Sequence, residues 1–82
     1  MEIRIDSKID IIIDTEKMMD VPDKKIEQVI GQIIIKFARW NCDRLSIISE
    51  GNNNLYCQFW NKGRVKMTMG AIWRGDEFTF HT

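Results

Sequence analysis

Two cysteines and a single histidine are the side chains of this 82-residue chain whose chemistry most readily suggests a nucleophile or a general base near neutral pH. Cys42 and Cys57 form no C-x-x-C pair, and no Ser/His/Asp or Cys/His arrangement can be assembled around His81. Cys57 falls on the apolar side of a predicted strand. Cys42 falls near the end of a predicted helix, where the negative end of the helix dipole disfavours a thiolate. We therefore predict no catalytic residue and interpret both cysteines as reduced thiols of a cytoplasmic protein.

Three aspartates, Asp6, Asp10 and Asp14, share the parity of one predicted strand and are the only pattern that resembles a set of ligands for a hard cation. Residues four positions apart in a strand lie about 13 Å apart, so a single strand cannot gather these carboxylates around one ion. The glycines occur singly, without a phosphate-binding pattern. We predict neither a metal site nor a cofactor.

The overall composition is that of one small globular domain covering residues 1–82, with 44% hydrophobic and 29% charged residues. Twelve basic and twelve acidic residues cancel, so the chain has no overall field that would attract nucleic acid or an anionic membrane. No apolar run approaches the roughly 18 residues that span a bilayer. We therefore expect no membrane partner.

The elements that carry these residues follow from the periodicity of the apolar side chains. In residues 1–14 the isoleucines fall mainly on odd positions and the charged residues on even ones, which is typical of a half-buried strand. This segment is either one long strand or a hairpin broken near Asp6-Ser7-Lys8. A helical turn is predicted over residues 15–19, and a long amphipathic helix follows Pro22 and ends near Trp40.

Two residues fit this helix poorly. Gly31 costs roughly 1 kcal/mol relative to alanine in a helix interior, and Ile35 falls on the polar side. The simpler interpretation is that Gly31 permits close packing and that Ile35 lies at the edge of the apolar stripe. The alternative is that both residues belong to a second contact surface.

Residues 44–82 predict a meander of strands joined by three tight turns. The turns are a three-residue Gly51-Asn52-Asn53 loop, a three-residue Asn61-Lys62-Gly63 loop and a two-residue Gly75-Asp76 turn. A two-residue Lys62-Gly63 turn would oppose Phe59 to Lys66 and mix the two faces, whereas the three-residue loop opposes Phe59 to Val65 and separates them. The core face then collects Leu45, Ile47, Leu55, Cys57, Phe59, Val65, Met67, Met69, Ala71, Trp73, Phe78 and Phe80.

Together these elements predict a two-layer α+β domain. We expect a mainly antiparallel sheet of about five strands, in the order β-α-β-β-β-β along the chain, with one long helix packed on one face. The pairing of the first strand stays open.

The outer face of this sheet is the candidate binding surface, because the sequence contains no second helix to cover it. Arg64 would oppose Trp60 across the Asn61-Lys62-Gly63 loop and could stack on its ring. Apolar, aromatic and arginine side chains gathered in this way are typical of protein interfaces. The candidate binding residues are Ile48, Tyr56, Trp60, Arg64, Lys66 and Ile72.

These features favour a small cytoplasmic, non-catalytic protein-interaction module that uses the outer face or an edge strand. Its partner could be a second copy of the same chain, which would make a homodimer. The alternative is a nucleic-acid-binding accessory protein, in which Tyr56 and Trp60 stack bases beside Arg64, Lys66 and Arg74. A small-molecule binder comes third. Zero net charge and the lack of an RNP-like motif weigh against nucleic acid.

Overall fold

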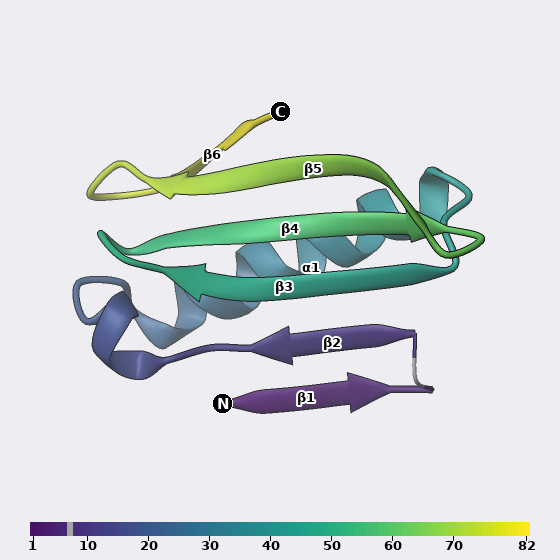
Figure 1. The fold of residues 1–82 in the computed structure, drawn as a ribbon. Coiled ribbons are helices and arrows are strands. Elements are labelled where there is room, and N and C mark those ends of the chain that lie inside the picture. Colours follow the sequence, from purple (N-terminus) through teal and green to yellow (C-terminus); the bar gives the residue numbers. More distant parts are fainter. Residues whose placement is uncertain (7) are drawn as a thin grey trace.

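A six-stranded sheet and one long helix make up the computed structural model, which describes residues 1–6 and 8–82 (Figure 1). The strand order in the sheet, β1-β2-β3-β4-β5-β6, is the same as the order along the chain. The predicted α+β class with a mainly antiparallel sheet is confirmed, with six strands rather than about five. The elements are β1 (Glu2–Ile5), β2 (Ile9–Ile12), the short 3-10 helix η1 (Thr15–Met18), α1 (Asp23–Arg39), β3 (Arg44–Glu50), β4 (Asn54–Asn61), β5 (Arg64–Trp73) and β6 (Phe78–His81).

The N-terminal segment forms the hairpin that the sequence left open, and not one long strand. β1 pairs antiparallel with β2, with Ile3 opposite Ile11, and Asp6 adopts a left-handed conformation at φ 52° where the chain turns. Ser7, the other central residue of the predicted break, lies outside the described residues. β2 then pairs in parallel with β3, with Ile11 opposite Ile47, so the first hairpin joins the rest of the sheet through the η1–α1 connection.

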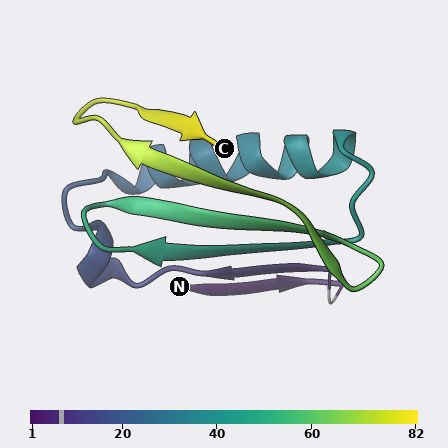
Figure 2. The same ribbon diagram turned by 45° about the horizontal axis from the view of Figure 1, so that its top comes forward.

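The helix α1 packs on one face of the sheet by means of a stripe of isoleucine and valine side chains. Figures 1 and 2 show it running along a single side of the sheet. The buried residues of the stripe are Ile26, Val29, Ile30 and Ile33. The close-packing interpretation of Gly31 is wrong, because a Cβ built at this residue would meet nothing within 4 Å. Ile35, one turn further on, is 52% exposed.

Two of the three predicted turns and their registers are confirmed. Between β3 and β4, Leu45 lies opposite Phe59, and Asn53 takes a left-handed conformation at φ 63° as expected for the loop that it closes. Between β5 and β6, Trp73 lies opposite Phe78, and Gly75 supplies the positive φ of 102° that the two-residue turn requires.

The remaining turn, between β4 and β5, was predicted wrongly. Asn61 pairs with Arg64, so the loop is the two-residue Lys62-Gly63 turn, with both residues left-handed at φ 53° and 77°. A bulge follows: Trp60 lies opposite Val65, whereas Phe59 lies opposite Met67. The extra residue in β5 corrects the mixed faces that a two-residue turn alone would produce.

The bulge moves the register by two positions relative to the prediction and therefore preserves which face each later residue occupies. Cys57 and Met69, which are both buried, now lie opposite each other. The exception is Val65, which we expected in the core. It lies opposite Trp60 and is 42% exposed, because the bulge separates it from the alternation of β5.

The core lies between α1 and the sheet face that carries the odd-numbered residues of β2, β3 and β4. Its central aromatic side chain is Phe59, which is fully buried and meets the Trp40 ring edge-on at 5.0 Å between centroids. Each large apolar side chain that is fully buried contributes about 1.5–3 kcal/mol to stability. The largest fully buried residues are Ile11, Ile33, Leu45, Ile47, Leu55, Cys57 and Phe59.

Candidate functional site

The sheet face opposite α1, here called the outer face, carries a row of apolar side chains that crosses three neighbouring strands. The register places Ile12 of β2 beside Ile48 of β3, and Ile48 beside Tyr56 of β4. Ile12 is 48% exposed and Ile48 is 38% exposed, whereas Tyr56 is half-buried. The next position in the row is Gly70, which extends no side chain over the face. We call Ile12, Ile48 and Tyr56 the apolar row.

An arginine stacks on Trp60, but it is Arg44 and not the predicted Arg64. Arg44 is opposite Trp60 in the β3–β4 pairing, and its guanidinium carbon lies 5.3 Å from the centre of the Trp60 ring. The prediction for Arg64 is wrong because it depended on the three-residue loop. In the two-residue turn Arg64 pairs with Asn61 instead.

Lys66 does not join this group either. Its ammonium donates a 2.8 Å hydrogen bond to the carbonyl oxygen of Trp40, the residue that caps the C-terminus of α1. A cation is favourable there because the last carbonyls of a helix are unpaired and carry the negative end of its dipole. As the extra residue of the bulge, Lys66 lies outside the alternation that the prediction assumed.

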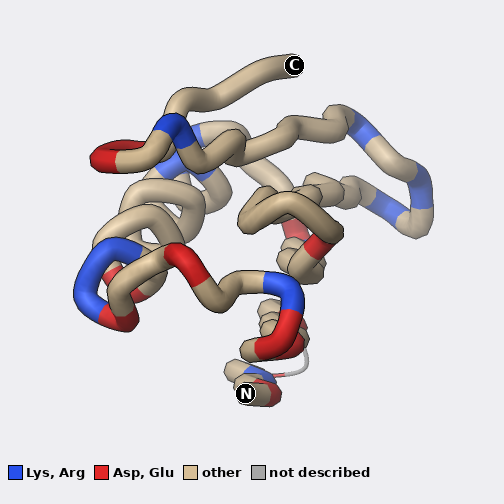
Figure 3. Tube along the Cα trace, turned by 90° about the vertical axis from the view of Figure 1, so that its left-hand side faces the viewer, with Lys and Arg blue, Asp and Glu red and all other residues tan. Residues whose placement is uncertain are grey.

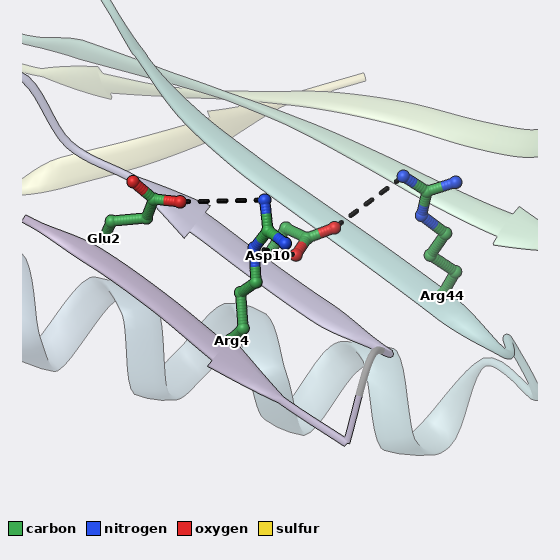
Figure 4. A network of polar contacts seen from close by, with 4 residues as sticks. All are labelled: Glu2, Arg4, Asp10 and Arg44. Atoms are coloured by element: carbon green, nitrogen blue, oxygen red, sulfur yellow. Dashed lines mark ion pairs between the residues drawn. The ribbon is translucent and has the colours of Figure 1, made fainter.

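The Arg44 side chain also ends an ionic network that runs across the outer face from the first strand. Arg4 lies 3.7 Å from Glu2 and 3.4 Å from Asp10, and Arg44 lies 3.7 Å from the second oxygen of Asp10. Figure 4 shows these four side chains together on the outer side of the strands. Exposed pairs of this kind add at most about 1 kcal/mol each to stability. The Arg44 guanidinium thus lies between Asp10 and the Trp60 ring.

The Trp60 ring is less available for stacking than the sequence indicated. Trp60 is half-buried, Arg44 lies over its ring, and its Nε1 atom is buried without a hydrogen-bond partner among the described residues. Ile72, on β5, is also half-buried on the same face. Of the six predicted site residues, the structure therefore brings Ile48 and Tyr56 together in the apolar row, places Trp60 and Ile72 on the same face, and separates Arg64 and Lys66 from them.

Two outer-face residues that carry this surface were missed by the sequence prediction. Arg44 could have been found, since the register that places Leu45 opposite Phe59 also places Arg44 opposite Trp60. Ile12 could not be placed, because its neighbours depend on the parallel pairing of β2 with β3. Its only signal was that it is the single apolar residue on the even positions of the first segment.

The side chains with nucleophilic or basic chemistry lie apart from this face or are engaged by neighbours. Burial raises the pKa of the Cys57 thiol from 9.0 to about 12, which keeps it protonated in the core. The Cys42 thiol donates to the Trp40 carbonyl at 3.4 Å. His81 Nε2 lies 3.1 Å from the Arg74 guanidinium, which also donates to the Thr79 hydroxyl. Within residues 1–6 and 8–82, no group of three His, Cys, Asp or Glu side chains could hold a metal ion.

Charges of both signs are interspersed around the fold. Figure 3 shows basic and acidic positions close to one another along most of the trace. The main exception is the β4–β5 hairpin, where Lys62, Arg64 and Lys66 follow one another without an acid between them. This basic stretch is separate from the apolar row, because Lys66 is directed to the end of α1.

No protein-family model matches the chain, and the comparisons with curated proteins and with solved structures found no match. In the part of the chain that the structure describes, no helix combines the length and the apolar character needed to cross a membrane.

Proposed function

We propose that this chain is a non-catalytic protein-binding module, and that its outer face binds an amphipathic helix of a partner protein. The observation that carries the proposal is the apolar row. Ile12, the last residue of β2, and Ile48 of β3 lie side by side on the outer face, 48% and 38% exposed, while α1 covers only the opposite face. Adjacent exposed isoleucines on one face mark a contact site more strongly than single apolar residues scattered over a surface.

The dimensions of the row favour a helix as its occupant. Neighbouring strands are about 4.8 Å apart, so a row over three strands is about 10 Å long and matches the apolar stripe along two turns of a helix. The polar side chains next to the row on the outer face, Ser46 and Gln58, could pair with the polar edge of such a helix. An apolar centre with a polar rim is the usual arrangement of a protein interface.

The affinity that the row can supply follows from its exposed area. Fully burying an isoleucine is worth about 1.5–3 kcal/mol, so covering the exposed parts of Ile12 and Ile48 contributes about 2 kcal/mol. Replacing both by serine should weaken binding about thirtyfold, since 1.4 kcal/mol corresponds to a factor of ten.

A photo-crosslinking amino acid at Ile48 tests this proposal, with the same amino acid at the exposed Ala38 of α1 as the matched control. We expect Ile48 to crosslink to another protein, within segments whose apolar residues recur at helical spacing. The Ile12→Ser variant should reduce that crosslinking. Crosslinks at Ile48 that are no more frequent than those at Ala38 would contradict the proposal.

A second candidate, binding of single-stranded nucleic acid, is favoured by one contact, the Arg44 guanidinium stacked over Trp60 on the face that also carries Tyr56. It is supported less well, since Lys66 donates to the end of α1 and the net charge is zero. Fluorescence anisotropy with random oligonucleotides at low salt distinguishes the two functions. Saturable binding at micromolar concentration that is lost in Trp60→Ala would support nucleic acid.

A further inference from the structure

The outer edge of β1 is a free strand edge with defined backbone donors and acceptors. β1 is the first strand in the order of the sheet, and among residues 1–6 and 8–82 only β2 pairs with it. Met1 and Ile13 exchange two backbone hydrogen bonds of 2.7 Å, so the odd residues of β1 direct their N–H and C=O groups toward β2. The N–H and C=O groups of Glu2 and Arg4 therefore point away from the sheet.

The same strand exposes apolar side chains on the side where α1 lies. Met1 is 53% exposed and Ile5 is 44% exposed, while Ile3 between them packs against the core. Beside Met1 is a groove whose apolar lining comes from Ile13 and Ile26. An edge strand that stays solitary usually avoids exposed apolar residues of this kind.

We propose that two copies of this chain dimerise by antiparallel pairing of their β1 edges about a two-fold axis at Ile3. In this register Glu2 of one copy lies opposite Arg4 of the other, twice by symmetry. Each of these pairs has its backbone groups directed outward and can exchange both hydrogen bonds. On the helix side, Ile3 meets Ile3 of the second copy and Met1 meets Ile5 of the second copy, beside the groove.

Charge selects this register over its symmetric neighbours. Within β1, only Glu2 and Arg4 direct their backbone groups outward. Two symmetric registers other than the proposed one would therefore also pair outward groups, one centred on Glu2 and one centred on Arg4. A dimer centred on Glu2 would oppose two glutamates, and one centred on Arg4 would oppose two arginines, and like charges directly opposite each other are destabilising. Only the register centred on Ile3 places opposite charges together.

The dimer also extends the ionic network. Arg4 already lies 3.4 Å from Asp10 within its own chain, and pairing would place Glu2 of the second copy on its other side. Charges of alternating sign would then continue from Arg44 through Asp10 and Arg4 into the second copy. The two sheets would become one, with both helices on the same side. This inference uses the edge of β1 and not the outer face, so it stands independently of the proposed function.

Charge reversal tests the register, with the mass in solution measured by light scattering or sedimentation at high micromolar concentration. The wild type should have twice the monomer mass of 9.7 kDa. Glu2→Arg and Arg4→Glu should each weaken dimerisation about tenfold or more, because each change acts at both symmetry-related pairs. An equimolar mixture of the two variants should recover the dimer, since the arginines of one chain then meet the glutamates of the other.

The controls separate this proposal from the outer-face proposal. Lys24→Glu, a charge reversal on the exposed side of α1, and Tyr56→Ala, on the outer face, should both leave the mass unchanged. Circular dichroism verifies that each variant is folded, and the second reversal provides the test if the first fails to fold. A monomeric wild type overturns the proposal. So does a dimer that persists in both reversals, or a mixture of the two variants that stays monomeric.

Discussion

Alkaline pH should destabilise this protein through the thiol of Cys57. This side chain is fully buried on the core face of β4, and burial raises its pKa from 9.0 to about 12. In the unfolded chain the thiol has its ordinary pKa and loses its proton above about pH 9. The free energy of unfolding is therefore unaffected by this thiol below pH 9. It falls as the pH rises from 9 toward 12, because in this range only the unfolded state gains from releasing the proton.

The size of the effect follows from the two pKa values. At pH 10 the unfolded state gains about 1.4 kcal/mol from ionisation of this thiol, and at pH 11 it gains about 2.7 kcal/mol. Other groups also titrate in this range, so the informative quantity is the difference between the wild type and Cys57→Ala. That variant lacks the thiol, although it starts from a lower stability because it leaves a small cavity.

The assay is urea unfolding of both proteins at pH 8, 9 and 10. The free energy of unfolding should fall more steeply with pH for the wild type, so that the gap between the two proteins narrows by about 1.4 kcal/mol. Cys42→Ala retains the buried thiol of Cys57 and should follow the wild-type slope. If the wild type and Cys57→Ala lose stability in parallel, burial does not hold this thiol protonated and the reasoning is refuted.

Three further changes test other parts of the fold by the same urea measurement. Gly31→Ala should raise the free energy of unfolding by about 0.5–1 kcal/mol, because the added Cβ meets nothing within 4 Å and the glycine is helical; a loss would mean that the exposed helix face is packed in solution. Lys62→Asn should raise it by about 0.5 kcal/mol, since asparagine tolerates the left-handed φ of 53° better than lysine and the backbone hydrogen bond from residue 62 to Asp43 is kept. Phe59→Ala should lower it by about 3–5 kcal/mol through the cavity left beneath Trp40, and a cost below about 1 kcal/mol would disprove the central place given to this ring.

Much of the fold could be predicted because local turn chemistry and side-chain alternation act together. Asn53 and Gly75 each occupy a turn position that needs a positive φ, and the registers that follow from these turns are the observed ones. The β4–β5 hairpin could not be resolved in this way. A three-residue loop and a two-residue loop followed by a bulge both separate apolar from polar residues, and alternation does not distinguish them.

The candidate site was predicted less well than the core because it depends on exact neighbours across strands. A residue's face follows from its parity alone, which is why Ile48 and Tyr56 were assigned to the outer face correctly. The arginine that stacks on Trp60 depends on which residue lies opposite, and the bulge changed that neighbour on one side. Ile12 depends on a parallel contact that no local turn encodes.

The strands lie in the sheet in the same order as along the chain, and this order affects how the molecule folds and how it opens. Strands β3 to β6 are joined by short turns, so this four-stranded ribbon can form through contacts that are local in the chain. The first hairpin joins it only after residues 13–43 have closed into a long loop, which costs more chain entropy. We expect β1 and β2 to be the last strands to assemble and the first to detach, with backbone amides that exchange with solvent sooner than those of β4.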